Sequence, residues 1–255
     1  MEALRDLIIV TCDAAFKDNI KEEKLENPEK DNNWILEPFQ IGEPPFYIEH
    51  VRRGIVHIAN NPNALLVLSG GQIKQGKWSG AKTYLSIAKY YKFWIPDEFE
   101  IKRKLRTDVQ NRTVTEDYAR DSFENLLFSI CRFQQVTGYY PYRIVVVSWT
   151  FKERRFDLHR AAIRFPFYRF CFDGFNIPID LPSAWRREAK IIREFRTDQY
   201  GYDPDSAIGK RRKEKNPFEK EHPYKNCPGL EAFFKFIEDP KNKRKIFPAR
   251  LPWEG

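Results

Sequence analysis

The sequence lacks the features that would place it in a membrane or in an oxidising compartment. No window approaches 18 consecutive apolar residues, so we expect no transmembrane segment. Its four cysteines (Cys12, Cys131, Cys171 and Cys227) are far apart and show neither a CxxC spacing nor a neighbouring histidine. We therefore expect free thiols in the reducing cytoplasm, and neither a disulfide framework nor a zinc site.

Common catalytic signatures are also missing. The chain contains no HExxH, no GxGxxG and no nucleophile elbow followed by Asp and His. The turn Ser69-Gly70-Gly71 is not a P-loop, because no Gly-Lys-Ser/Thr follows it. A function therefore has to be inferred from how separate polar patches come together.

What the chain does contain is an alternation of short apolar runs and longer helical patterns. Runs typical of buried strands are Asp6–Thr11, Ala64–Leu68, Arg143–Ser148 and, more weakly, Tyr168–Phe172. Helical patterns occupy Phe46–Asn60, Ser79–Phe93, Glu116–Thr137, Phe151–Phe165 and Ser183–Thr197. This alternation predicts an α/β fold, a three-layer sandwich with a mainly parallel sheet. We expect a long loop over Lys17–Asn33 and one more short strand near Thr107–Gln110.

The last quarter of the chain differs in composition. We interpret residues 1–197 as one α/β domain and residues 198–255 as a basic extension that packs on it, with a helix only around Gly229–Ile237. Gly209–Lys225 holds seven Lys/Arg against three Glu, and Lys235–Arg250 holds six against two acids, which together equal the whole net charge of +8. Such a region can attract an anionic membrane surface or simply aid solubility. Nucleic acid is a less favoured partner, because regular aromatic stacking residues are missing.

The segment Glu116–Asn125 is the densest polar cluster. On a helix, residues three and four apart share a face, so Tyr118, Ser122 and Asn125 would lie together with Asp121 and Glu124 beside them. A polar pocket for an anion or a metal is one interpretation. The other is a capped surface helix, with Thr115 as N-cap and a Glu116–Arg120 pair.

In an open parallel sheet, ligands bind beyond the carboxyl ends of the strands. The predicted strand ends bring four patches to one crevice, namely Asp13, Ser69–Gly71, the cluster at Ser122–Asn125, and Ser148 with Lys152, Arg154 and Arg155. The amides of Ser69–Gly71 could cradle a phosphate. Cations at a helix start oppose its dipole, which favours a bound anion there. His159, two turns further on, is expected to support the site and not to act as a base.

These residues together resemble the SanA/YdcF/ElyC-like family of domains of unknown function, and its soluble eukaryotic branch in particular. The matching segments are Leu65–Gly71, Asp121–Asn125 and Val145–Phe156, with a further match at the Lys215–Pro228 region. The resemblance implies a Rossmann-like α/β sandwich. It also implies an association with S-adenosylmethionine binding or with polyprenyl-linked sugar metabolism.

The chain departs from the family at two positions. Relatives usually carry an acid where Gly80 stands, and a histidine where Lys152 stands. If those groups carry out the family's chemistry, this member is altered or inactive. Asp13 is a candidate replacement carboxylate.

Three functional hypotheses remain open at this point. The first is a hydrolase or transferase for a phosphorylated or pyrophosphate-linked substrate, lipid- or sugar-linked substrates included. Glu124 and Asp13 would bind Mn²⁺ or Mg²⁺ or act as acid and base, with Ser122 as a further catalytic candidate. Its ligand-binding candidates are Ser69, Gly70, Gly71, Asn125, Ser148, Lys152, Arg154 and Arg155. The second hypothesis is a non-catalytic binder of S-adenosylmethionine or a nucleotide, and the third is binding to an anionic surface through the basic extension.

Overall fold

The computed structural model describes residues 4–21, 24–73, 77–94, 108–215 and 221–255. A parallel five-stranded sheet in the order β5-β4-β1-β6-β7 forms its centre. Its strands are β1 (Asp6–Thr11), β4 (Ala64–Ser69), β5 (Thr113–Glu116), β6 (Arg143–Ser148) and β7 (Phe170–Gly174). The helices are α1 (Pro44–Asn60), α2 (Gly80–Tyr90), α4 (Ser122–Thr137), α5 (Glu153–Ala162), α6 (Leu181–Thr197), α7 (Ala207–Glu214) and α8 (Glu231–Ile237). A small antiparallel pair, β2 (Ala15–Phe16) and β3 (Trp34–Ile35), lies to one side.

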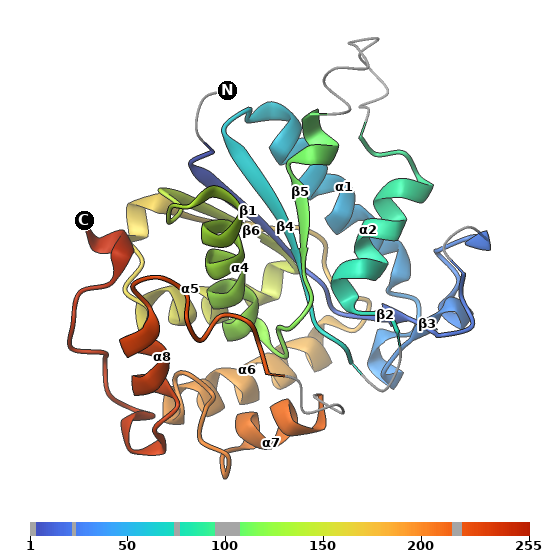
Figure 1. Cartoon of the computed structure of the whole chain (residues 1–255). Coiled ribbons are helices and arrows are strands. Elements are labelled where there is room, and N and C mark those ends of the chain that lie inside the picture. The colour runs from blue at the N-terminus through green and yellow to red at the C-terminus, as the bar shows by residue number, and fades with distance from the viewer. Residues whose placement is uncertain (1–3, 22–23, 74–76, 95–107, 216–220) are drawn as a thin grey trace.

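Helices cover both faces of the sheet, as Figure 1 shows. Alternate residues of β1 point to opposite faces. Leu7 and Ile9 join the core beneath α4 and α5, whereas Ile8 and Val10 join the core beneath α1 and α2. The predicted Rossmann-like three-layer sandwich is therefore confirmed. Among the described residues, no helix has both the length and the apolar character that crossing a membrane requires.

The strand order determines where a crevice opens. From β1 the chain moves outward to β4 and β5, and it then returns to place β6 and β7 on the other side of β1. The reversal between β1 and β6 is the topological switch point at which such sheets bind ligands. There the hydroxyl groups of Thr11 and Ser148 lie 2.7 Å apart and hydrogen-bond across the two strand ends.

The C-terminal extension packs on the face covered by α4. Its α7 contacts α6, as Figure 1 shows, and its residues Tyr224, Phe233 and Trp253 belong to the same buried core as Phe123 of α4. Trp253 donates its Nε1–H to the carbonyl oxygen of Ile163 at 2.8 Å. The last residues of the chain are thus built into the α/β core.

Several local expectations were wrong. The predicted helix Glu116–Thr137 begins only at Ser122, because Thr113–Glu116 pairs with β4 as a strand and Asp121 caps the helix by accepting the N–H groups of Phe123 and Glu124. Tyr118 therefore does not share a helix face with Ser122.

Near the predicted strand at Thr107–Gln110, the described part of the segment is a helical turn, and Thr107 lies outside the described residues. The weak fourth strand lies two residues later than expected, at β7. The extension contains α7 besides α8, with Ser206 as its N-cap.

Trp253→Ala tests whether the extension and the sheet fold as one unit. Trp253 is 2% exposed and packs against Phe165 and Tyr140. We expect the variant to lose about 3–5 kcal/mol of unfolding free energy in a single urea transition. Tyr168→Ala is the matched control, because that ring is 82% exposed and its loss should cost within about 0.5 kcal/mol. A separate early transition in Trp253→Ala would show that the extension folds independently.

Candidate functional site

A cavity of about 280 Å³ opens at the carboxyl ends of β1, β4 and β6. Its walls come from the strand ends, from the start of α4, from η4 (Thr150–Lys152) with α5, from η3 (Pro38–Gln40) and from α6. Of the residues predicted from the sequence, those that line it are Asp13, Gly71, Ser122, Asn125, Lys152 and Arg155. We call this cavity the crevice.

Asp13 and Lys152 form a buried ion pair on the crevice wall. Burial alone would raise the pKa of Asp13, but the charge and the hydrogen bond of Lys152 outweigh it, so the pKa lies below its usual value. Only Oδ1 of Asp13 meets Lys152. The buried Oδ2 atom has no hydrogen-bond partner among the described residues.

Arg155 of α5 and Glu188 of α6 form a second buried pair, with 2.8 Å between Nη2 and Oε2. Burial raises the pKa of Glu188 even though Arg155 and Lys152 act to lower it. The pair is poorly aligned for hydrogen bonding. Within the described chain, Nε of Arg155 and both carboxylate oxygens of Glu188 are buried without a hydrogen-bond partner.

Ser122, at the first position of α4, contacts His159. Its Oγ lies 2.8 Å from Nε2 of the histidine. Burial, with the nearby charge of Arg155, lowers the pKa of His159 to about 3, so the ring is neutral at physiological pH. His159 is enclosed by aromatic rings, the nearest being Phe195 at 4.4 Å between centroids. The geometry agrees with a supporting role for His159, which holds the Ser122 hydroxyl at the crevice.

Glu124 does not face the crevice. Its carboxylate is fully buried and accepts hydrogen bonds from the backbone N–H and the guanidinium of Arg120, and Arg212 lies 3.5 Å from it. The structure therefore does not bring Glu124 to Asp13 as the expected metal-binding or acid–base pair. Among the residues that the structure describes, no three His, Cys, Asp or Glu side chains gather in a way that could hold a metal ion.

The glycine turn after β4 has no amides to spare for a phosphate. The N–H of Gly70 donates to the carbonyl of Glu116 at 3.0 Å, and the N–H of Gly71 donates to that of Ala119 at 2.7 Å. Both glycines are needed for close packing, since a Cβ at Gly70 would lie 2.7 Å from Cβ of Cys12. The expected cradle for phosphate at Ser69–Gly71 is thus a closed structural turn.

Two other predicted residues lie outside the crevice. Arg154 is exposed and is not part of its lining, because it projects from the outer side of α5. Ser148 is fully buried beneath the crevice, where it meets Thr11.

Gly80 is packed as tightly as the glycines of the Ser69–Gly71 turn. A Cβ at this position would lie 2.9 Å from Cβ of Cys12, at the place where α2 approaches the end of β1. A larger acidic side chain would push the helix away from the sheet. In this chain a glycine at position 80 is therefore a packing requirement.

The sequence interpretation missed Glu188, an acid on the apolar side of α6. A signal was present, because Ala184, Glu188 and Ile192 follow one another at intervals of four residues on the buried face of a predicted helix. A carboxylate in such a stripe needs a buried partner. Arg187 also lines the crevice, where it stacks over the ring of Phe39 at 4.0 Å. No pattern in the sequence indicated this position.

Glu116, which lies behind the crevice, has a pKa that is raised toward neutral pH. Burial raises its pKa to about 7 despite hydrogen bonds from Ser69 and from the N–H groups of Tyr118 and Ala119. The Ser69 hydroxyl has one hydrogen but lies 2.8 Å from Glu116 and 3.0 Å from Oδ1 of Asn125. A protonated Glu116 resolves this, because it donates to Ser69 while Ser69 donates to Asn125.

The variant Glu116→Gln tests this protonation. The folded pKa of about 7 lies above the ordinary 4.5, so between these pH values the folded state holds a proton that the unfolded chain has released. The associated stability is fully present below pH 4.5 and is lost as the pH rises through 7. We expect wild type to lose about 2–3 kcal/mol more than Glu116→Gln between pH 5 and 8, measured by urea unfolding. Glu153→Gln, an exposed control, should follow wild type, and parallel profiles for all three proteins would refute the assignment.

The chain is similar along its whole length to a yeast protein. The chain is 23% identical over 306 residues to an uncharacterized protein of Saccharomyces cerevisiae (strain ATCC 204508 / S288c), an alignment that covers 100% of this chain and 99% of the yeast protein. No family model matches the sequence. No solved structure matches it. The site must therefore be interpreted from its own geometry.

Proposed function

We propose that the crevice binds a phosphorylated or nucleotide-like small molecule and that the protein is a hydrolase or transferase acting on it. The observation that carries this proposal is a group of unsatisfied atoms on one wall. Oδ2 of Asp13, Nε of Arg155 and Oε1 of Glu188 are buried without a hydrogen-bond or ion-pair partner in the described part of the chain. Buried polar atoms are nearly always hydrogen-bonded, so a cluster of exceptions beside a cavity indicates a ligand or ordered water.

The kinds of atoms in this group suggest the chemistry of the ligand. The carboxylate oxygens of Asp13 and Glu188 accept hydrogen bonds, which suits the hydroxyl groups of a sugar or ribose. The guanidinium of Arg155 and the ammonium of Lys152 donate, which suits phosphate oxygens. Phe39 and Phe151 supply apolar surface on the same crevice for the face of a sugar ring or a base.

The two carboxyl groups also differ in a way that is useful for catalysis. The pKa of Asp13 is lowered and that of Glu188 is raised. Carboxyl groups whose environments separate their pKa values commonly serve as base and acid. In the proposed reaction Asp13 accepts a proton from the attacking water or hydroxyl group. A substrate phosphate replaces Glu188 as the partner of Arg155, and Glu188, protonated in that state, donates a proton to the oxygen of the leaving group. Glu188 thus takes the role that the sequence had suggested for Glu124.

A non-catalytic binder of a nucleotide or S-adenosylmethionine is the second candidate. The occupied amides of Gly70 and Gly71 favour it, because no free pair of N–H groups in that turn is available to stabilise a developing negative charge. The resemblance to the SanA/YdcF/ElyC-like family is compatible with both candidates and remains a hypothesis.

Binding to an anionic surface is less well supported. Internal ion pairs neutralise part of the positive charge of the extension. The pairs are Arg211 with Glu194, Arg212 with Asp121, and Lys243 with Asp203. Charges held in this way contribute less attraction to an anionic surface.

A thermal-shift panel tests binding. It comprises sugar phosphates, nucleotides, sugar nucleotides, prenyl diphosphates and S-adenosylmethionine, each with and without Mg²⁺ or Mn²⁺. A ligand at about 100 times its Kd adds roughly 2.7 kcal/mol and should raise the melting temperature by several degrees. Lys152→Gln should weaken the shift, whereas Arg154→Gln, two residues along the chain and outside the crevice, should not. Equal shifts in both variants would contradict binding in the crevice.

Turnover is tested with the compounds that bind, followed by phosphorus NMR. We expect Asp13→Asn and Glu188→Gln each to lower the rate by about 100-fold or more, as loss of an acid or base does. Glu153→Gln, an exposed acid on α5, serves as the control. Full activity in Glu188→Gln would overturn its role as the acid, and binding without any product would favour the non-catalytic candidate.

A further inference from the structure

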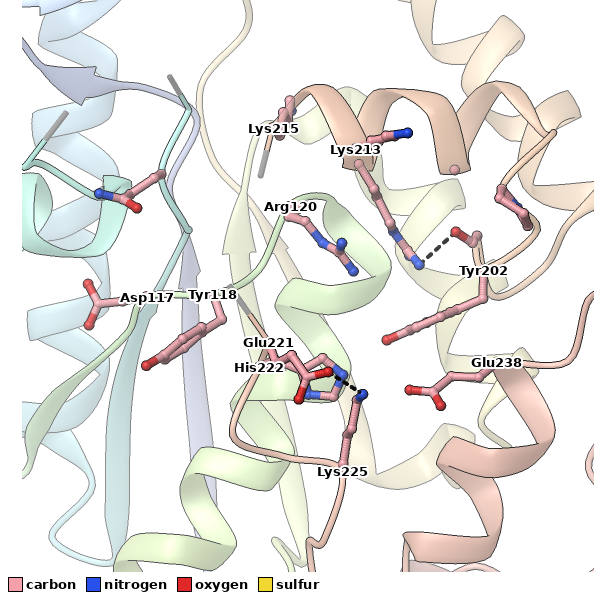
Figure 2. A pocket seen from close by; sticks show the side chains of 15 residues that line it. Asp117, Tyr118, Arg120, Tyr202, Lys213, Lys215, Glu221, His222, Lys225 and Glu238 are labelled. Carbon is pink, nitrogen blue, oxygen red and sulfur yellow. Dashed lines mark hydrogen bonds and ion pairs between the residues drawn. The ribbon is translucent and has the colours of Figure 1, made fainter. Parts of the chain in front are cut away.

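A second cavity, of about 360 Å³, lies between the β5–α4 loop and the C-terminal extension. Figure 2 shows it from close by. Tyr118 and Arg120 come from the loop, and Tyr202, Lys213, His222 and Lys225 come from the extension. The predicted catalytic and ligand-binding residues are not part of this lining, although Tyr118 and Arg120 belong to the polar segment Glu116–Asn125.

Two buried polar atoms in this cavity lack a partner. The backbone N–H of Tyr224 donates to Nδ1 of His222 at 3.3 Å, and burial lowers the pKa of His222 to about 4. The neutral ring therefore carries its hydrogen on Nε2, and this donor is unsatisfied among the described residues, as is Oη of Tyr202. In Figure 2 the Tyr202 hydroxyl points into the space bordered by Arg120 and His222.

The lining of this cavity is held rigidly. The ring of Tyr202 lies 4.6 Å from the guanidinium carbon of Arg212, which Asp121 and the carbonyl oxygen of Gly201 hold in turn. The His222 ring packs on Phe128 with 4.6 Å between centroids. Both unsatisfied groups are thus presented in fixed positions, as a binding site requires.

The two cavities are neighbours. Gln72, Arg120 and Lys215 belong to the lining of both. The crevice alone, at about 280 Å³, is slightly smaller than the range of about 300–1,000 Å³ typical of small-molecule sites. With the second cavity added, the space falls well within that range. The shared lining therefore suggests one site with two chambers.

Two lysines bring positive charge to the region beside the shared lining, since Lys215 lines both cavities and Lys213 lines the second. Inside the crevice, Lys152 and Arg155 already face carboxylates. The side-chain ammonium groups of Lys213 and Lys215 form no ion pair or hydrogen bond with another residue that the structure describes. The uncompensated charge at the border suits an anionic group there, in addition to any phosphate that Lys152 and Arg155 bind in the crevice.

We propose that the crevice and the second cavity form one site for a diphosphate-bridged ligand, with a polar group in each chamber and the diphosphate beside Lys213, Lys215 and Arg120. The proposal rests on the proposed function, since the crevice holds one end of the ligand. Asp13 and Glu188 would bind hydroxyl groups of that end. Tyr202 and Nε2–H of His222 would bind the other end, whose recognition needs at least one hydrogen-bond acceptor.

Calorimetric titration with inorganic diphosphate tests the border site. We expect saturable binding to the full chain, tighter than that of inorganic phosphate. Lys213→Ala and Lys215→Ala should each weaken it by about tenfold, the loss expected for one charge-assisted contact. Lys210→Ala is the matched control, because Lys210 lies on the same helix and outside both linings. No binding, or equal binding in all three variants, would overturn the border site.

The same measurements separate this proposal from the function proposed above. One outcome is that Lys152→Gln weakens the binding of panel compounds but Lys213→Ala and Lys215→Ala leave the affinity for diphosphate unchanged. That result would contradict the two-chambered site and leave the function proposed for the crevice intact. The opposite outcome is that the two lysine variants weaken the binding of diphosphate while Lys152→Gln leaves the binding of every panel compound unchanged. That result would contradict the function proposed for the crevice.

Tyr202→Phe tests the second chamber without disturbing the fold. Its hydroxyl is buried and unpartnered in the described structure, so its removal should leave the melting temperature unchanged or higher. Affinity for panel compounds that contain a diphosphate should nevertheless fall by about fivefold to tenfold. Unchanged affinity would exclude Tyr202 from the site, and a lowered melting temperature would show that its role is structural.

Discussion

Two buried ion pairs hold the crevice together. Asp13 with Lys152 joins the end of β1 to η4, and Arg155 with Glu188 joins α5 to α6. Leaving one member of such a pair alone in the interior is costly, by about 3–5 kcal/mol, so these elements are held at fixed separations around the cavity. The pairs are incomplete, however, because buried atoms on both remain without hydrogen bonds among the described residues. The same interaction that shapes the crevice thus leaves polar groups for a ligand, and the proposed function depends on this property.

A second network explains why the most conspicuous polar segment of the sequence is not an open site. Arg120 and Arg212 neutralise Glu124 and Asp121 at the start of α4. Since Arg212 belongs to α7, this network also fastens the extension to the α/β domain. One result is the second cavity, whose wall includes both arginines. The basic extension therefore forms part of the wall of the second cavity.

Much of the fold follows from local patterns in the sequence. The apolar runs at β1, β4 and β6 and the convergence of Asp13, Ser122 and Lys152 were predictable, because parallel strands place their carboxyl ends at one edge. Which distant residues pair with one another could not be predicted from these patterns. Glu124 and Asp13 look equally free in the sequence, yet Arg120 and Arg212 bury the first, while Lys152 leaves one oxygen of the second unsatisfied. The occupied amides of Gly70 and Gly71 likewise depend on the path of the β5–α4 loop, which no periodicity specifies. Glu188 was detectable only by asking what partner an acid on an apolar stripe requires.

Hydrogen–deuterium exchange tests the central claim most directly, namely that a phosphorylated ligand binds in the crevice. The measurement compares the protein alone with the protein saturated by whichever panel compound raises its melting temperature most. The account predicts slower exchange in peptides that contain Trp149–Phe156 and Ala184–Phe195, since those segments line the crevice. Protection confined to other parts of the chain, or a panel in which no phosphorylated compound raises the melting temperature, would contradict it.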